Sequence, residues 1–256
     1  MDDINHEIAN LPDLLSQGLA GCQNRMADYL FEMAHMDGLD ELSTTGVLPY
    51  LLLKYFQKVM DLYDESARCL LGRLRRSGVI IQCRPLCSHC CHHMPAGVGA
   101  MELIYIYHAM NRSRAMDRMF RHSLEAEESW AEIRKQYMLD RKSGDLTDFR
   151  EEEALERYQR LRQPCPFLEG SLCQIYPCRP LVCRMHYSLS PPYWCHPSHF
   201  QNPNAVRFNL EPGESVFDAL EQLNNRFHLH LSDVMVPGLL QMIVNVMQFR
   251  EIRWSR

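Results

Sequence analysis

The cysteines of this 256-residue chain are unevenly distributed, and their placement constrains the fold more than any other feature of the sequence. Nine of the eleven lie between residues 83 and 195, in two groups with no cysteine between them. The first group contains Cys83, Cys87, Cys90 and Cys91. The second group contains Cys165, Cys173, Cys178, Cys183 and Cys195. An odd total of cysteines cannot pair completely within one chain, which favours metal ligands over a disulfide framework.

The sequence also indicates a reducing compartment. Its first residues, Met1-Asp2-Asp3-Ile4-Asn5, lack the basic and apolar regions of a secretory signal. No apolar run approaches the length of a membrane span. We therefore expect a cytoplasmic protein without a membrane partner, and clustered thiols in the cytosol are more often metal ligands than disulfides.

The charge balance argues against binding to polyanions. A net charge of −5 and a pI near 6.2 leave the chain slightly acidic. Non-specific binding to DNA or RNA draws its affinity from Lys and Arg side chains that neutralise phosphates. We therefore expect no nucleic-acid partner, and no motif identifies a protein partner.

Apolar residues recur with the helical period over most of the chain, which predicts a mainly α fold. The expected helices cover residues 12–35, 48–77, 100–140, 147–163, 214–228 and 236–250. Signals for the helix ends are Pro49, Gly78, Thr147 with Asp148, and Ser232 with Asp233. The hydrophobic content of 46% is sufficient for a packed core.

Signals for strands are scarce. A single short hairpin is expected, with residues 166–168 and 173–176 on either side of Glu169-Gly170-Ser171. Residues 187–212 contain five prolines among Ser and Asn, which predicts an irregular segment. The expected fold is one helical domain over 1–256, with a Cys-rich, largely irregular metal-binding segment and at most one short β-hairpin. Its expected parts are N-terminal helices (1–81), a cysteine-cluster metal-binding core (82–210) and C-terminal helices (211–256).

The spacing of the cysteines suits metal binding. Cys87 and Cys90 form a C-x2-C step, with which one tight loop can direct two sulfurs at one metal. The adjacent Cys90 and Cys91 fit a polynuclear centre, or two metals side by side, better than a single ion. We expect all nine cysteines of the two groups to be ligands. Four thiolates leave a net negative charge, and Arg179 and Arg184 are the expected donors that stabilise it.

These motifs resemble the YkgJ-type cysteine-cluster family, whose members are described as zinc- or iron-chelating proteins and sometimes as iron–sulfur proteins. Flagellin lysine N-methylases carry a similar cluster. The resemblance covers residues 83–184, where the family has C-x2-C-x2-C-C, an acidic residue, then C-x-F-L and C-x-I-Y-x2-R-P-x2-C-R. The matching cysteines are Cys83, Cys87, Cys90, Cys91, Cys165, Cys173 and Cys183. The other matching residues are Phe167, Leu168, Ile175, Tyr176, Arg179, Pro180 and Arg184.

The chain departs from the family pattern at two positions. Cys83 precedes Cys87 by four positions instead of three, which makes Cys83 the least secure ligand. Gly99 stands where the family usually has a Thr that caps the following helix. Glu102 matches the family's acidic position, three residues after Gly99, where a carboxylate can reach back to the N–H of the cap residue. We favour this capping role for Glu102 over metal coordination.

The remaining candidate ligands are less specific. Histidines flank both groups, at His89, His92, His93, His186, His196 and His199, and a neutral imidazole can bind zinc or iron. Nearby thiols already suffice for one complete site, so the histidines are weaker candidates, with His93 and His196 favoured among them. Cys178 and Cys195 lie outside the family pattern and could complete a second site. Cys22 and Cys69 fall in helical patterns, where we expect cysteine to act as a small hydrophobe.

The pattern leaves both the metal and the activity open. Zinc usually takes paired C-x2-C steps, whereas iron–sulfur clusters draw on a short motif plus remote single cysteines, and this chain fits the latter slightly better. We expect a metal-binding protein that holds an iron–sulfur cluster or zinc. The alternative is a redox or protein-modifying enzyme that uses an iron–sulfur centre. Gly97-Val98-Gly99 lacks the third glycine of a dinucleotide fingerprint. We interpret the C-x3-C-x2-C spacing from Cys83 as coincidental, because no barrel pattern surrounds it.

Overall fold

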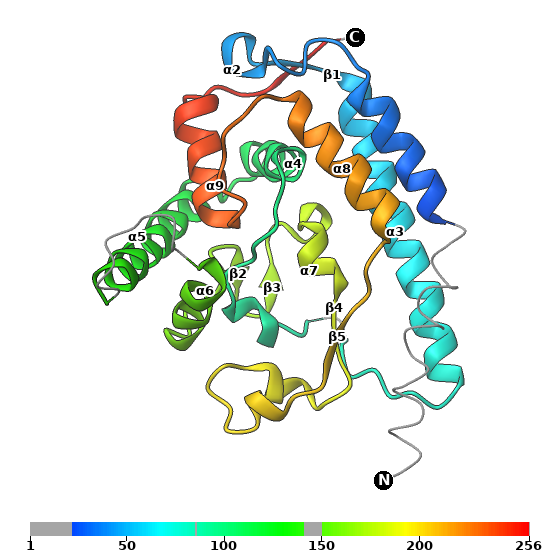
Figure 1. Cartoon of the computed structure of the whole chain (residues 1–256), viewed down its shortest axis with the longest axis vertical. Helices are drawn as coiled ribbons and strands as arrows, with labels where there is room; N and C mark the ends of the chain where they lie inside the picture. The colour runs from blue at the N-terminus through cyan, green and yellow to red at the C-terminus, as the bar shows by residue number, and fades with distance from the viewer. Residues whose placement is uncertain (1–21, 85, 141–149, 256) are drawn as a thin grey trace.

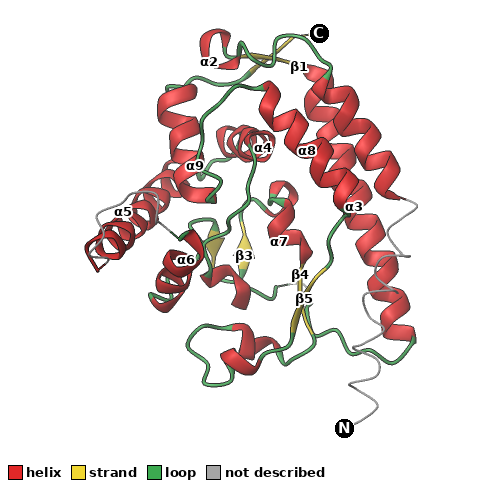
Figure 2. Cartoon of the chain, viewed as in Figure 1, coloured by secondary structure: helices red, strands yellow, loops and turns green. Residues whose placement is uncertain are grey.

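The computed structural model of the chain describes residues 22–84, 86–140 and 150–255, most of them helical (Figure 2). After a helix over 22–34, the helices are α2 (Leu42–Thr45), α3 (Tyr50–Arg76), α4 (Ala100–Asn111), α5 (Met116–Asp140), α6 (Glu151–Arg160), α7 (Leu181–Met185), α8 (Glu214–Arg226) and α9 (Met235–Gln241). Shorter turns are the 3-10 helices η1 (His89–His92), η3 (Tyr176–Cys178), η4 (Pro192–Cys195) and η5 (Asn202–Asn204) and the π-helical η6 (Met242–Val246). The predicted mainly α fold is confirmed.

The long helix α3 follows from its apolar stripe. Leu52, Phe56 and Tyr63 recur with the helical period and are almost completely buried. Three arginines lie in the last turn, where they face the negative end of the helix dipole. Gly78 follows with a φ of +93°, a left-handed conformation that glycine adopts without strain. The N-terminal helix runs antiparallel beside α3 in Figure 1.

Helix α4 lies at the centre of the fold, seen end-on in Figure 1. Nine of its twelve residues are buried, as expected of a helix that is apolar on all sides. It packs against α5, α8 and α9. Gly238 allows α9 to approach closely, because a Cβ at that position would lie 2.9 Å from Leu103 Cδ1. The first turn of α4 faces the cysteine-rich segment, so this helix anchors that segment to the core.

In the described part of the chain the strands form three two-stranded sheets, more than the single hairpin expected. The predicted hairpin exists in a shorter form, with β2 (Leu168–Glu169) antiparallel to β3 (Leu172–Cys173). A second antiparallel pair joins β4 (His186–Ser188) to β5 (Arg207–Asn209). A parallel pair joins β1 (Val47–Pro49) to β6 (Arg253–Ser255). The β4–β5 pair ties down both ends of the irregular stretch that contains η4 and η5.

Two of the predicted helix starts need comment. The last helix begins at Met235 with Val234 at its N-cap, so the prediction of Ser232 and Asp233 as caps is wrong. The Ser232 hydroxyl instead accepts the N–H of Val234 at 3.2 Å, which turns the chain into the helix. Helix α6 begins at Glu151 with Arg150 at its N-cap. The cap candidates Thr147 and Asp148, and the first part of the helix expected over 12–35, lie outside the described residues.

One hydrophobic core extends through the described chain, from Met26 in the first helix to Ile252 before β6. It takes in Phe167 and Ile175 from the cysteine-rich segment, so that segment shares the core of the helices. Within the described ranges, no helix combines the length and the apolar character needed to cross a bilayer.

Candidate metal centre

The two cysteine groups, far apart in the sequence, lie side by side in the fold. The backbone N–H of Cys165 donates to the carbonyl oxygen of Cys91 at 2.7 Å. At the start of the first group, the N–H of Gln82 donates to the carbonyl oxygen of Ser188 at 3.0 Å. Between these points η1 packs against η4. In Figure 1, η1 is the short teal turn between the β2–β3 hairpin and the yellow loop below it.

The cysteines are free thiols. All eleven lie within the described residues, and none forms a disulfide. Within the same ranges, no three Cys, His, Asp or Glu side chains stand in an arrangement that would hold a metal ion. Two other features describe the surroundings of the sulfurs. One is the hydrogen bonds that the sulfurs accept from backbone N–H groups, and the other is the effect of each thiol on the pKa of its neighbours.

Three of the sulfurs accept a hydrogen bond from the backbone two residues further along the chain. The donors are the N–H groups of His89 to Cys87, Phe167 to Cys165 and Ile175 to Cys173. A backbone N–H directed at sulfur stabilises the thiolate over the thiol. Such hydrogen bonds also tune sulfur ligands in metal centres. Local backbone structure in both groups therefore favours thiolate ligands.

Sulfurs from both groups affect the pKa of two thiols, Cys165 and Cys183. Loss of hydration raises the pKa of the Cys183 thiol to about 12, and the neighbouring Cys90 and Cys173 add to this rise. Loss of hydration also raises the pKa of Cys165, and Cys183, Cys173 and Cys90 add to it. Thiolates that lie within electrostatic range of one another need a compensating positive charge, because each disfavours ionisation of the next. Four thiolates are the ligand set of a zinc ion or a cubane iron–sulfur cluster, so this donor set fits either.

The sulfur of Cys83 lies beside β4 and near Cys195 of η4. The N–H of Ser188 donates to Cys83 Sγ at 3.3 Å. Loss of hydration raises the pKa of Cys83 to about 11 against the effect of that hydrogen bond, and Cys87, Cys90 and Cys195 raise it further. Cys83, the least secure ligand in the sequence, thus lies among other thiols.

Cys178 has a different environment from the other cysteines of the second group. Its sulfur is hydrogen-bonded to the hydroxyl of Tyr105, a buried residue of α4. Loss of hydration raises the pKa of Cys178, and the Tyr105 hydrogen bond and the charge of Arg184 oppose the rise. The side chains that affect its pKa are Tyr105 and Arg184. Because Tyr105 belongs to α4 and Cys178 ends η3, this contact links η3 to α4.

Arg184 fixes the turn of residues 177–184, which carries Cys178 and Cys183. Its side chain is 2% exposed and forms an ion pair with Asp64 of α3. It also donates to the carbonyl oxygens of Arg179 at 2.9 Å and Pro177 at 2.7 Å. The acceptors of these hydrogen bonds are oxygen atoms. The positive charge of Arg184 nevertheless opposes the rise in the pKa of the Cys173 thiol. Arg184 therefore combines the expected role, stabilising the negative charge of the thiolates, with a structural role in the turn.

Arg179 supplies a second positive charge beside the thiols. Its guanidinium lies over the ring of Tyr176, 4.2 Å from the centroid. Its charge lowers the pKa of Cys173, Cys183 and Cys90, against the loss of hydration that raises them. Arg179 therefore favours thiolates in both groups.

Glu102 joins the starts of two helices, which confirms the predicted capping role. Its carboxylate is 2% exposed and accepts the N–H of Gly99 at 3.0 Å, at the start of α4. The other oxygen accepts the N–H of Leu181 at 2.7 Å, at the start of α7. Burial raises its pKa, and the two backbone hydrogen bonds oppose the rise. Since α7 carries Cys183, Glu102 positions that cysteine relative to the core.

Comparison with known families agrees with this geometry. Residues 82–205 match the family model CxxCxxCC, described as a "putative zinc- or iron-chelating domain". We refer to the matched part of the chain, residues 82–205, as the CxxCxxCC domain because of this similarity. The match confirms the resemblance seen in the sequence and extends it to Cys195. Searches among curated proteins and among solved structures gave no match.

Three histidines of the CxxCxxCC domain lie together beside the thiols. The ring of His196 is 4.4 Å from that of His92 and 6.0 Å from that of His89, centroid to centroid. Nδ1 of His196 accepts the N–H of Ser198 at 3.1 Å, which places the proton of the neutral ring on Nε2. Metal binding through Nε2 would require that proton to move to Nδ1, and Nδ1 could then no longer accept the N–H of Ser198. The tautomer thus disfavours His196 as a ligand.

His93, the other favoured histidine, lies near an arginine and two histidines. Loss of hydration lowers its pKa to about 4, and Arg207, His186 and His92 lower it further. Its ring is therefore neutral near pH 7, as metal binding requires. The neighbours with these effects on His93 are an arginine and two histidines, so its position gives no support for a shared site with the thiols.

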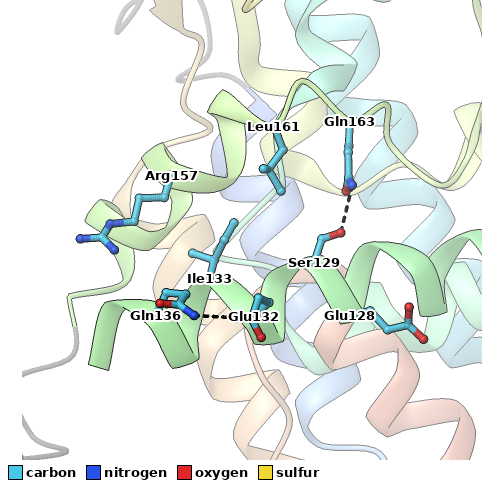
Figure 3. Close-up of a pocket in the computed structure, with 8 residues that line it drawn as sticks. All are labelled: Glu128, Ser129, Glu132, Ile133, Gln136, Arg157, Leu161 and Gln163. Carbon is cyan, nitrogen blue, oxygen red and sulfur yellow. Dashed lines mark hydrogen bonds between the residues drawn. The ribbon is translucent and has the colours of Figure 1, made fainter. Parts of the chain in front are cut away.

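A pocket of about 470 Å³ lies between α5 and α6, apart from the thiols (Figure 3). Its lining residues are Glu128, Ser129, Glu132, Ile133, Gln136, Arg157, Leu161 and Gln163. Two hydrogen bonds join residues that line it. The side chain of Gln163 donates to Ser129 Oγ at 2.9 Å, and that of Gln136 donates to Glu132 Oε1 at 2.7 Å. No cysteine or histidine lines this pocket, so it is separate from the candidate centre of the CxxCxxCC domain.

The sequence did not predict which residues of other helices support the candidate centre. Asp64, Tyr105 and Asn224 lie in regular helical patterns, where nothing marks them as partners of the CxxCxxCC domain. One signal was present. Gly99 in place of the usual Thr implied that the first turn of α4 needs another cap, and Asn224 provides it by accepting the N–H of Met101 at 3.0 Å.

Proposed function

We propose that this protein binds zinc or iron through thiolates from both cysteine groups, with an iron–sulfur centre favoured over zinc. The observation that carries the proposal is the hydrogen bond from the N–H of Cys165 to the carbonyl oxygen of Cys91 at 2.7 Å, which brings the two cysteine groups side by side. The effect of Cys90 on the pKa of Cys165 and Cys183 agrees with it. The CxxCxxCC match supports a zinc- or iron-chelating role. The proposed ligands are Cys83, Cys87, Cys90, Cys91, Cys165, Cys173, Cys183 and Cys195. Cys178, expected with them, is the weakest candidate of the second group, because the side chains that affect its pKa are Tyr105 and Arg184 and not the thiols of the other candidates.

The preference for iron–sulfur rests on the spacing of the second group. Cys165, Cys173 and Cys183 are single cysteines at unequal intervals, whereas zinc sites usually use paired steps. A bound cluster would supply one-electron chemistry. Zinc would tie the β2–β3 hairpin and α7 to η1 and stabilise the fold. We also propose a cytoplasmic location, which cell fractionation with compartment markers would test.

Elemental analysis decides between the metals. The full chain is purified without oxygen, and zinc, iron and acid-labile sulfide are measured per chain together with the absorption spectrum. Iron with equivalent sulfide and a brown colour supports the cluster. Stoichiometric zinc in a colourless protein overturns the iron–sulfur preference and keeps the metal-binding role. A chain with neither metal contradicts the proposed function.

A further inference from the structure

The loop that joins β4 to β5, residues 189–206, exposes aromatic side chains. Phe200 is 80% exposed and Tyr193 is 52% exposed. The ring of His199 contacts both, at 4.8 Å from Phe200 and 5.1 Å from Tyr193 between centroids, and Trp194 stacks on it at 6.4 Å. In Figure 1 the loop is drawn in yellow and runs from β4 and β5 toward the lower edge of the view. Four rings thus form one surface on this segment, which we call the aromatic loop.

Hydrogen bonds within the aromatic loop fix its shape. The side chain of Asn202 donates to the carbonyl oxygen of Trp194 at 3.1 Å, and the carbonyl oxygen of Asn202 accepts from Arg207 Nη2 at 3.0 Å. Nδ1 of His199 accepts the N–H of Gln201 at 3.2 Å. A surface that is ordered before binding loses less conformational entropy when a partner docks. The exposed rings are thus held in one arrangement, and exposed apolar clusters mark interaction sites.

The charges around the aromatic loop are positive. Residues 170–210, which include the loop, contain no Asp, Glu or Lys, although the whole chain has 32 Asp and Glu. Residues 77–99, which include η1, contain none of these types either. Loss of hydration lowers the pKa of His196, and the neighbours that lower it further are His92, His89, Arg162 and His199. Each of these neighbours is a cation or becomes one on protonation, so this surface attracts negative charge in a chain whose net charge is −5.

The composition of this surface is that of a protein–protein interface. The centres of such interfaces are enriched in Tyr, Trp, Phe and Arg and depleted in Lys, Glu and Asp. The aromatic loop supplies Tyr193, Trp194 and Phe200, and the arginines beside it are Arg162 and Arg207. Nucleic-acid binding instead draws its affinity from many Lys and Arg contacts to phosphates. With few cations and no Lys between residues 170 and 210, the surface favours a protein partner over a nucleic acid.

We propose that the aromatic loop, together with Arg162, is the docking surface for an acidic segment of another protein, one that carries carboxylates beside an apolar side chain. The apolar side chain packs on the rings of Phe200 and Tyr193, and the carboxylates pair with Arg162. Because η1 packs against η4, the docked segment lies beside the turn that carries Cys90 and Cys91. This inference goes beyond the proposed function, since the surface does not depend on which metal the thiols bind.

Selection from a library of short random peptides displayed on phage tests the proposal. The full chain, purified without oxygen, is immobilised as the target. We expect the enriched peptides to combine Asp or Glu with a large apolar residue. The most enriched peptide is then synthesised with a fluorescent label and titrated with the chain, and its affinity should fall as salt is added, because exposed charges are screened. Enriched peptides without acidic residues would overturn the proposal.

Matched variants locate the binding site of the labelled peptide. Phe200→Ala should weaken binding roughly tenfold or more, because a central aromatic anchor carries much of the binding energy. Since Phe200 is so exposed, its truncation leaves the fold intact. Arg162→Gln should weaken binding and reduce its dependence on salt. The control Phe31→Ala, at a position 54% exposed in the first helix, should bind as the unsubstituted chain does. All three variants should keep its metal content and helical circular dichroism.

Three further outcomes overturn the inference. Unchanged affinity in Phe200→Ala excludes the aromatic loop as the docking surface, and unchanged affinity in Arg162→Gln excludes the pairing with carboxylates. Single-stranded DNA of random sequence and phosphatidylglycerol vesicles are titrated in the same way. Binding to either that is tighter than to the peptide and is lost in Phe200→Ala would mean a different class of partner. A chain that binds the peptide but holds neither zinc nor iron contradicts the proposed function alone.

Discussion

The carboxylate of Glu102 in α4 accepts the backbone N–H of Leu181, the first residue of α7, at 2.7 Å. Its other oxygen closes the first turn of its own helix through Gly99. One buried side chain thus fixes the helix after the first cysteine group against the helix that carries Cys183. This link sets the relative position of the two groups before any metal is bound.

Glu102→Ala removes the acceptor for two buried N–H groups. We expect a loss of roughly 3 kcal/mol in the free energy of unfolding, because each unsatisfied buried donor costs about 1–3 kcal/mol. Urea denaturation followed by circular dichroism measures it. Glu102→Gln is the matched comparison, since its single carbonyl oxygen can accept from one N–H group but not readily from both. A loss in Glu102→Ala no larger than that in Glu102→Gln would contradict the bridging role.

Arg184→Met tests the buried arginine that organises the turn of 177–184. It leaves Asp64 without its ion-pair partner and two carbonyl oxygens without their donor. We expect a loss of about 3 kcal/mol, at the lower end for a broken buried pair, because the Asp64 side chain is 36% exposed. We also expect weaker metal retention during dialysis against a chelator, since this turn leads into Cys183.

Arg118→Met provides the control for Arg184→Met. Arg118 also pairs with a carboxylate, that of Glu169, but both side chains are exposed, at 38% and 52%. An exposed pair contributes less than about 1 kcal/mol. Equal losses in the two variants would mean that burial of Arg184 adds nothing to stability.

The helices and the grouping of the cysteines followed from the sequence, because both depend on local patterns. The stripe of α3 and the hairpin between Leu168 and Cys173 are examples. The β4–β5 pair was missed, since its strands are short and are separated by the proline-rich loop. The cap of α9 was also missed, because Ser232 uses its hydroxyl in a turn before the helix begins.

The partners of the candidate centre could not be predicted, because they depend on tertiary contacts. Nothing in the apolar periodicity of α3 indicates that Asp64 reaches Arg184. Cys178 had the same sequence signal as its neighbours, and only the position of Tyr105 separates it from them. Glu102 was predicted as a cap for its own helix, but its second bond, to Leu181, required the fold.

Gly99 and Asn224 form a pair that can be exchanged for the family's usual cap. A Cβ at Gly99 would lie 2.0 Å from Asn224 Nδ2, so Gly99→Thr alone should cost about 1–3 kcal/mol. Asn224→Ala alone should cost about 1 kcal/mol by removing the acceptor for Met101. In the double variant the Thr hydroxyl can cap α4, so the loss should be smaller than the sum. Thermal denaturation of all four proteins measures the coupling, and additive losses would refute it.

Leu86 adopts a left-handed backbone conformation, with a φ of +68°, just before Cys87. The N–H of Cys87 closes this turn on the carbonyl oxygen of Arg84 at 3.1 Å. The side chain of Leu86 is 66% exposed, so little packing is lost on truncation. Leu86→Gly should therefore raise stability by about 0.5–1 kcal/mol, because glycine tolerates this conformation. Leu86→Val should lower it, and a Gly variant less stable than the Val variant would argue against backbone strain.

The central claim is that sulfurs from both cysteine groups hold the same metal. Metal content per chain, measured by mass spectrometry on protein purified without oxygen, tests it with one variant from each group. Cys90→Ser and Cys173→Ser should each lose the same share of bound zinc or iron, and the control Cys69→Ser, at an exposed position of α3, should lose none. Full metal content in either Cys90→Ser or Cys173→Ser would contradict the account.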